Sequence, residues 1–175
     1  VNYIAGQIEK ILLFLSDHGY AGFSVATGLP IKIMAARSGL GRYGKNAVIH
    51  APAGGSWLAL GAIFTEAPLE TDNPLEDDCG NCDICQRACP TGALRDPYKC
   101  NIEKCVTLHT LYNKGIIPLE IREKMGTCIA QCNICIDACP KNKTLSLQNH
   151  ISNPENLGYP EIAPLVNMTD AHFQK

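Results

Sequence analysis

Ten cysteines lie between residues 79 and 139, and most of them follow one short spacing. The pattern C-x2-C-x3-C-P occurs twice, once from Cys82 and once from Cys132. Closely spaced thiolates of this kind hold cubane [4Fe-4S] clusters, so two copies of the pattern predict two clusters. A disulfide framework would scatter its cysteines, whereas these are grouped at the spacing of metal ligands.

The spacing also predicts which cysteines share a cluster, because in two-cluster ferredoxins the cysteine before proline ligates the other cluster. The first cluster is expected to be held by Cys79, Cys82, Cys85 and Cys139. The second is expected to be held by Cys89, Cys132, Cys135 and one further thiolate. The step from Cys128 to Cys132 is one residue longer than usual, so the residues leave three candidates for that ligand: Cys100, Cys105 and Cys128.

Zinc is the alternative metal, because four-cysteine zinc sites also combine pairs of C-x2-C units. A four-cysteine zinc site requires neither the third cysteine of each pattern nor the two Cys-Pro ends. Iron–sulfur clusters are therefore the favoured interpretation.

The remaining residues must supply the elements that position these thiols. Apolar residues at helical spacing predict a helix over 1–18 that ends at Gly19. A short strand is predicted over 21–26 and a helix over 31–38. Segments 47–50 and 56–64 are predicted to pair as a hairpin. Its expected core residues are Trp57, Leu58, Leu60, Ile63 and Phe64.

The acidic segment 65–78 is interpreted as a linker that holds the domain boundary. Beyond the first cysteine pattern, helices are predicted over 101–112 and 118–125. Residues 142–163 are expected to be extended, and 169–173 to begin a terminal helix.

A glycine-rich segment, residues 39–46, reads Gly-Leu-Gly-Arg-Tyr-Gly-Lys-Asn. It follows a predicted helix and leads into a β-prone run, so it does not fit the strand–loop–helix context of a dinucleotide site. It is either a tight turn with close backbone packing or a loop shaped to approach a large cofactor. In the second case the cofactor contacts would be Gly39, Gly41, Arg42, Tyr43, Gly44, Lys45 and Asn46. Tyr43 is then a candidate proton donor, since reduction needs a proton as well as electrons. His50 is interpreted as a structural strand residue.

Composition excludes several other classes of protein. The 175 residues are 46% hydrophobic and 18% charged with a net charge of −2, which is typical of a globular protein. No basic run predicts a broad nucleic-acid surface. No apolar run approaches the roughly 18 residues of a membrane span. We expect a reducing, cytoplasmic location.

The glycine-rich segment, Gly55-Ser-Trp57, residues 60–65 and both cysteine patterns resemble epoxyqueuosine reductases over most of residues 31–175. The cysteine half also resembles corrinoid reductive dehalogenases. The resemblance implies a cobalamin-dependent reductase whose clusters feed a corrinoid held by a nitroreductase-like domain, with a ferredoxin or flavodoxin as electron donor. It also implies Cys105 as the fourth ligand of the second cluster, because Lys104-Cys105 matches the family segment that carries the extra thiolate. Cys100 and Cys128 would then be spare.

The chain departs from that family at three places. Arg42-Tyr43 stands where the family usually has Trp-Ile, and residues 25–30 lack the aspartate that the family uses for catalysis. The family also has more residues before the position of Val1. These departures concern the catalytic half more than the cysteine half.

The predicted fold class is α+β, with three parts. Residues 1–70 form a small α/β domain like half of a nitroreductase, 71–150 a ferredoxin-like domain with two [4Fe-4S] clusters, and 151–175 an extended tail. The predicted function is an iron–sulfur oxidoreductase that passes single electrons through two clusters to a corrinoid or substrate bound by the N-terminal domain. The alternative is a non-catalytic, ferredoxin-like electron carrier that serves a partner redox enzyme.

Overall fold

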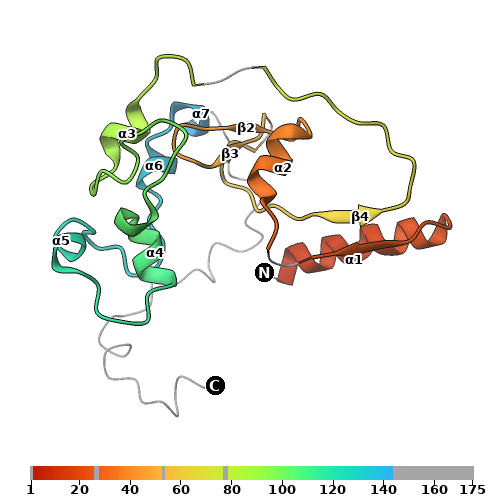
Figure 1. The fold of residues 1–175 in the computed structure, drawn as a ribbon, viewed down its shortest axis with the longest axis horizontal. Helices are drawn as coiled ribbons and strands as arrows, with labels where there is room; N and C mark the ends of the chain where they lie inside the picture. Colours follow the sequence, from red (N-terminus) through yellow and green to blue (C-terminus); the bar gives the residue numbers. More distant parts are fainter. Residues whose placement is uncertain (1, 26–27, 53, 77–78, 144–175) are drawn as a thin grey trace, which may run out of the picture. The chain divides into compact units, whose positions relative to one another are not determined.

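The computed structural model describes residues 2–143 except 26–27, 53 and 77–78, and these residues belong to one compact unit that runs from Val1 to Leu145 (Figure 1). Short helices and strands alternate, which gives a mixed α/β fold. In order, the elements are α1 (Asn2–Asp17), β1 (Gly22–Ser24), α2 (Ile31–Arg37), β2 (Arg42–Tyr43), β3 (Ile49–His50), β4 (Ile63–Thr65), α3 (Ile84–Ala88), a 3-10 turn η1 (Ile102–Lys104), α4 (Val106–Leu111), α5 (Leu119–Arg122), α6 (Ile134–Asp137) and α7 (Pro140–Lys143).

The predicted domain boundary in residues 65–78 stays a prediction. Most of the segment predicted to be extended, and the predicted terminal helix start, lie outside the described residues. No helix among the described residues combines the length and apolarity that crossing a membrane requires.

Helix α1 packs against β1, which pairs with the antiparallel strand β4 so that Phe23 stands opposite Phe64. The contact is close, because a Cβ on Gly22 would lie 3.1 Å from a methyl group of Leu12. Gly19 ends the helix with a φ of +82°, a left-handed conformation that glycine adopts at low cost. The predicted first helix, its stop and the following strand are therefore confirmed.

The predicted hairpin between 47–50 and 56–64 is wrong. β3 pairs instead with β2, where Tyr43 stands opposite Ile49, and β4 pairs with β1. Ala51 and Gly55 form an isolated bridge. The β2–β3 connection, residues 44–48, is as long as the expected one, residues 51–55, so loop length does not distinguish the two pairings.

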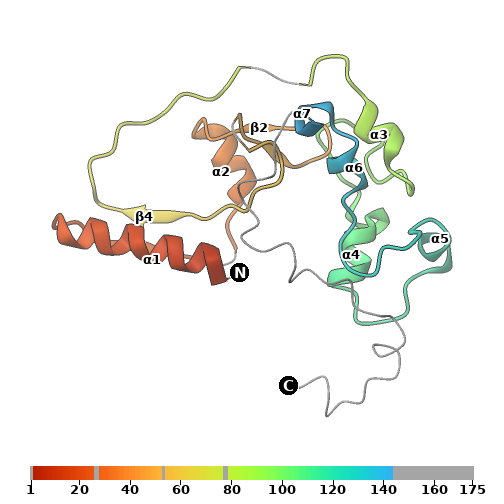
Figure 2. The ribbon, with the colours of Figure 1, turned by 180° about the vertical axis from the view of Figure 1, so that it is seen from behind.

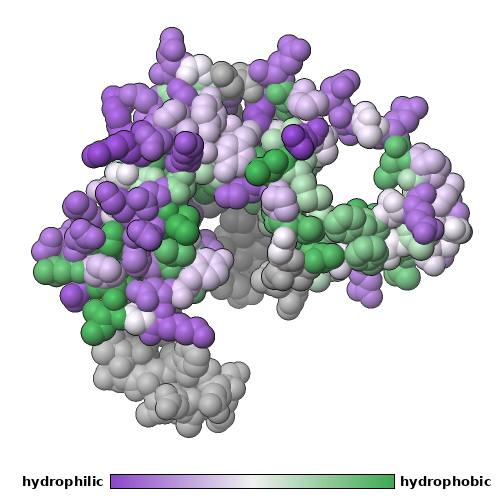
Figure 3. All heavy atoms as spheres, in the orientation of Figure 1, coloured by the Kyte–Doolittle hydropathy of each residue, from purple (hydrophilic) through white to green (hydrophobic). Residues whose placement is uncertain are grey.

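The predicted core of that hairpin is also corrected. Trp57 is 40% exposed and Phe64 38% exposed, while Leu58, Leu60 and Ile63 are only half-buried. The reason is that β1 and β4 form a sheet of two strands, which cannot bury both of its faces. Figure 3 shows apolar side chains on the surface along α1 and β4.

The two cysteine patterns fold in the same way. α3 and α6 each begin at the isoleucine inside the C-x2-C step, after an Asp83 or Asn133 residue with similar backbone angles (φ −129°, ψ 12° and φ −107°, ψ 7°). The two helices contact each other and lie side by side in both views (Figures 1 and 2). The sequence repeat is thus a structural repeat.

The helix predicted over 101–112 is interrupted at Cys105. This residue is extended (φ −76°, ψ 120°), so it ends η1 and stands at the N-cap of α4. Its backbone therefore belongs to neither η1 nor α4. The helix predicted over 118–125 is present but shorter, with Pro118 at its N-cap as α5 begins.

Candidate metal centres

The first candidate centre is a small cavity whose wall contains four thiols. They are contributed by the turn before α3, by α3 itself and by the end of α6: Cys79, Cys82, Cys85 and Cys139. Within the turn, the Cys82 N–H donates to the Cys79 carbonyl at 3.0 Å, which curls the backbone around the cavity. Cys85 and Cys139 are buried, and the other two thiols are half-buried.

The turn between β2 and β3 closes this cavity from the other side. The backbone N–H of Lys45 donates to the Cys79 sulfur at 3.5 Å. The Lys45 ammonium donates to the carbonyls of Gly80 and Cys82 at 2.5 and 3.0 Å. Lys45 was predicted to contact a cofactor through the glycine-rich loop; the structure places it on the backbone of the ligand turn.

His50 lies deeper in the same wall. Its Nε2 is 3.0 Å from Asn46 Oδ1, and its Nδ1 is 4.0 Å from the Cys139 sulfur. An amide oxygen can only accept, so Nε2 carries the proton and donates it to Asn46. Burial, and then the positive charge of Lys141, lower the pKa of His50.

His50 lies in strand β3, as the prediction of a structural strand residue requires, but its place beside Cys139 was not predicted. That place depends on the β2–β3 register, in which His50 stands opposite Arg42. Gly44 is required by the same contact, because a Cβ there would lie 2.6 Å from both Asn46 Oδ1 and His50 Nε2.

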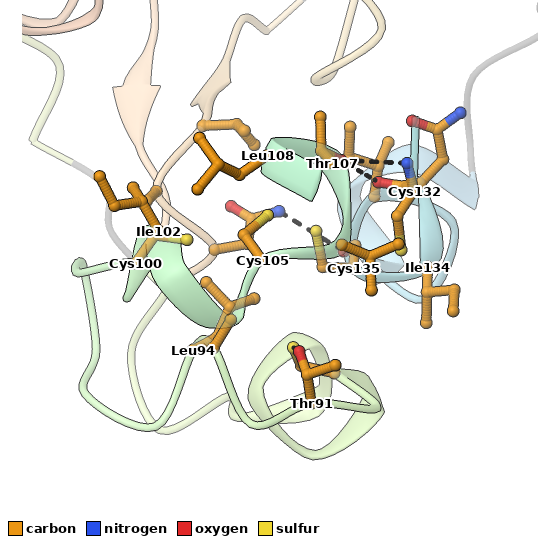
Figure 4. Close-up of a pocket in the computed structure, with 18 of the residues that line it drawn as sticks. Thr91, Leu94, Cys100, Ile102, Cys105, Thr107, Leu108, Cys132, Ile134 and Cys135 are labelled. Atoms are coloured by element: carbon orange, nitrogen blue, oxygen red, sulfur yellow. Dashed lines mark hydrogen bonds between the residues drawn. The ribbon is translucent and has the colours of Figure 1, made fainter. Parts of the chain in front are cut away.

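The second candidate centre is a larger cavity of about 410 Å3 (Figure 4). Five thiols line it: Cys89, Cys100, Cys105, Cys132 and Cys135. Much of the rest of its wall is apolar and includes Leu94, Ile102, Val106, Leu108 and Ile134.

Asn46 lines both cavities. Its Nδ2 donates to the Cys135 carbonyl at 3.4 Å, while its Oδ1 accepts from His50 in the first cavity. The side chain is 4% exposed, so both of its bonds are made inside the protein. One buried amide therefore joins the backbone of one centre to the imidazole of the other.

The pKa values of Cys105 and Cys100 are shifted in opposite directions. The pKa of Cys105 is lowered to about 5, first by a hydrogen bond from the Cys100 thiol and then by backbone N–H groups at the start of α4, against the opposing effect of burial. The same hydrogen bond, together with burial, raises the pKa of Cys100. The two shifts have opposite directions and favour Cys105 over Cys100 as a ligand, because the thiolate is the form of cysteine that binds a metal.

Cys128 is the remaining spare thiol. It hydrogen-bonds to Cys132 but does not line the cavity. The Cys132 backbone is fixed by Thr107, whose hydroxyl accepts the Cys132 N–H at 3.0 Å and reaches the Cys132 carbonyl at 3.4 Å. Cys132 thus lies on the cavity wall, and Cys128 is not part of that wall.

The donor set fits cubane clusters. Burial raises the pKa of Cys85, Cys132 and Cys135, the last to about 12, so these thiols are protonated until a metal displaces the proton. Within residues 2–143 as described, no three His, Cys, Asp or Glu side chains are placed to hold a metal ion. A zinc ion needs sulfur atoms about 2.3 Å from one point. Thiols spread around a cavity suit a larger group.

The other residues of the glycine-rich loop contact the chain itself. Gly39 has a φ of +70°, and a Cβ there would overlap the Asn73 carbonyl. A Cβ on Gly41 would lie 2.6 Å from the Ile49 side chain. These contacts match the interpretation as a tight turn with close packing. Arg42 and Tyr43 are half-buried strand residues, and the predicted catalytic role of Tyr43 stays a prediction.

Comparison with known proteins adds the family context. Residues 78–142 match the model of a 4Fe-4S double cluster binding domain. The epoxyqueuosine reductase of Lactococcus garvieae is 36% identical over 173 residues, which are 97% of this chain and 48% of the relative. That of Bacillus subtilis is 38% identical over 157 residues, 86% of this chain and 40% of the relative.

Solved structures give the same result. A crystal structure of an epoxyqueuosine reductase with an epoxyqueuosine-modified tRNA stem loop has a TM-score of 0.86 and 35% identity, over 99% of this chain and 47% of the other. Selenomethionine-labelled epoxyqueuosine reductase has a TM-score of 0.88 and 32% identity, over 99% of this chain and 48% of the other. The chain is thus a homologue of epoxyqueuosine reductases that carries a double [4Fe-4S] cluster domain, and it spans about half the length of the relatives it matches.

Proposed function

We propose, from this homology and from the two thiol-lined cavities, that the chain is the cluster-bearing part of an iron–sulfur reductase. Cys79, Cys82, Cys85 and Cys139 would hold one [4Fe-4S] cluster. Cys89, Cys105, Cys132 and Cys135 would hold the other. Such clusters supply single electrons, which a reductase needs at a bound substrate or corrinoid.

One observation supports the proposal most strongly. The two cysteines that precede proline lie in opposite cavities from their own patterns, Cys139 with the first set and Cys89 with the second. This exchange is the ligation pattern of two-cluster ferredoxins. Two separate zinc sites would have no reason to exchange their last cysteine.

Anaerobic reconstitution tests this proposal. Iron and sulfide analysis of the desalted chain is expected to give about eight of each per chain, from two [4Fe-4S] clusters. About four would reject the second cluster. One zinc ion per cavity, retained after purification from zinc-supplemented medium in preference to iron, would reject iron–sulfur chemistry.

The electron acceptor is a separate proposal, because the contacts around the two cavities do not identify one. A corrinoid or a substrate would bind beside the half-buried Arg42 and Tyr43, with a ferredoxin or flavodoxin as electron donor. Titration of the cluster-loaded chain with a cobalamin, followed by the visible spectrum of the cobalamin, tests corrinoid binding. Near-stoichiometric binding supports a corrinoid acceptor, and no spectral change at high micromolar cobalamin rejects it for this chain.

An electron carrier is the second candidate, and one observation favours it. Gly39, Gly41, Gly44 and Lys45 all make contacts inside the chain, so the loop needs no external cofactor to explain its residues. A carrier would pass electrons to a partner enzyme and bind no corrinoid. The same titration separates the two candidates, while the iron content is expected to be identical.

Whether this chain binds a nucleic acid is a separate question. The related crystal structure contains a tRNA stem loop, whereas the sequence here shows no basic run. The prediction that the chain lacks a broad nucleic-acid surface can be checked with a labelled RNA stem loop in a gel-shift assay at low salt, because phosphate contacts strengthen as salt falls.

A further inference from the structure

We propose that Cys100 can serve as the fourth ligand of the second cluster in place of Cys105. This inference rests on the proposed function, in that the larger cavity must hold a [4Fe-4S] cluster. It gives a metal-binding role to a cysteine that the spacing of the motifs leaves over.

The first reason is the number of thiols. A cubane cluster takes four thiolates, and the smaller cavity is lined by four. The larger cavity is lined by five, because Cys100 belongs to its wall as much as Cys105 does. Figure 4 shows both side chains at the same cavity, on the segment that flanks η1.

The second reason is the direction in which the Cys100 sulfur lies. It hydrogen-bonds to Cys105 and also interacts electrostatically with Cys89 and Cys135. Cys105 acts on Cys135 in the same way, as does Cys89. Cys100 and Cys105 therefore share the neighbour Cys135 and lie on the wall of one cavity, and Cys100 is also a neighbour of Cys89.

The third reason is that the backbone holds Cys100 in place. The N–H of Asn101 donates to the Ala93 carbonyl at 2.8 Å, and Ala93 and Leu94 are each only 3% exposed. Cys100 is itself half-buried. A thiol fixed to a buried wall loses little further conformational entropy when it binds a metal.

In the unaltered chain Cys105 is the proposed ligand, since it stands at the N-cap of α4 on the wall of the cavity and matches the family segment that carries the extra thiolate. When Cys105 is removed, the Cys100 thiol loses both its partner and its competitor. It then releases its proton to solvent as its sulfur bonds to iron, and no electron is gained or lost. Iron and sulfide come from the reconstitution mixture.

Cys128 provides the matched control. It hydrogen-bonds to the cluster ligand Cys132, as Cys100 does to Cys105, but it stands outside the cavity wall. A contact with a ligand is therefore common to both spare cysteines. Of the two, only Cys100 also lines the larger cavity.

The test measures iron and sulfide after anaerobic reconstitution, together with the electron paramagnetic resonance (EPR) spectrum of the dithionite-reduced chain. Unaltered chain at about eight iron atoms establishes the two clusters; about four there would defeat the proposed function itself. Given eight in the unaltered chain, Cys105→Ala and Cys100→Ala are each expected to retain about eight. Cys105→Ala is expected to change the EPR signal of one cluster only, because one of its ligands has moved.

The double variants decide the identity of the substitute ligand. Cys100→Ala with Cys105→Ala is expected to fall to about four iron atoms, and Cys128→Ala with Cys105→Ala to stay near eight. Three results would each overturn the inference. They are four or fewer iron atoms in Cys105→Ala, about eight in the Cys100→Ala and Cys105→Ala double variant, and about four in the Cys128→Ala and Cys105→Ala double variant. Cys105→Ser provides a second single variant at the same position, and the EPR signal of the cluster at Cys79 reports that each variant has folded.

Discussion

Substituting Gly44 by alanine should damage the first cavity without touching any cysteine. A Cβ at this position would lie 2.6 Å from both Asn46 Oδ1 and His50 Nε2, well inside van der Waals contact. These two atoms are hydrogen-bonded to each other, and both residues are 4% exposed. The neighbours cannot move aside into solvent, so the hairpin must open or the bond must break.

The cost follows from those two effects. Forcing one extra carbon into a packed site costs roughly 1–3 kcal/mol. Losing a buried hydrogen bond adds about 1 kcal/mol. Together they should lower the unfolding free energy by about 2–4 kcal/mol, which for a chain of this size lowers the Tm by roughly 4–16 °C.

The assay is anaerobic thermal unfolding of the cluster-loaded chain, followed by circular dichroism and by visible absorbance. Loss of the Lys45 and His50 contacts should also make the first cluster leave at a lower temperature than the second. Gly6→Ala is the matched control, because nothing lies within 4 Å of its Cβ and it stands inside α1. There alanine should stabilise the chain by up to about 1 kcal/mol. A Gly44→Ala chain within about 0.5 kcal/mol of the unaltered one, with both clusters bound, would refute the steric argument.

Three other results are expected. Lys45→Met removes two charge-assisted hydrogen bonds to the turn that carries Cys79 and Cys82, so the free energy of unfolding should fall by about 1–2 kcal/mol. A chelator should then remove the first cluster several-fold faster, and Lys45→Arg should keep most of the stability and of the slower cluster loss. Asn142→Ala removes two buried hydrogen bonds, one to the Ser56 N–H and one to the Ser56 hydroxyl, and should lower the free energy of unfolding in urea by about 2–4 kcal/mol. The same substitution at the exposed Asn113 should change it by less than about 0.5 kcal/mol. Because burial raises the pKa of Cys135 from 9.0 to about 12, the metal-free chain should hold its stability below pH 9 and lose it as the pH rises toward 12. Cys135→Ser should flatten that decline in an unfolding series against pH.

The cysteine half could be read from the sequence because its signal is local. The C-x2-C steps fix three thiols on one turn, and the repeated isoleucine after Asp83 and Asn133 starts α3 and α6 in the same way. Which residue completes the second centre was open, because the backbone break at Cys105 depends on tertiary contacts that spacing does not encode. The assignment of Cys105 as that ligand came from the family resemblance and not from the spacing.

The first 65 residues were harder to predict because their strands are two or three residues long. Alternating apolar residues are compatible with several pairings at that length, so the hairpin was assigned to the wrong partners. His50 was missed for the same reason. Its place beside Cys139 follows from the β2–β3 register, and register cannot be inferred from a two-residue strand.

Asn46 and its neighbours also bear on how this protein can be divided. The match to the double-cluster family begins at residue 78, yet Lys45, Asn46 and His50 form part of the wall around the first cavity. A fragment that starts at the linker would keep every cysteine and lose these three residues. The cluster half is therefore not an interchangeable cassette. Grafting it onto another catalytic domain would have to carry the β2–β3 hairpin along with it.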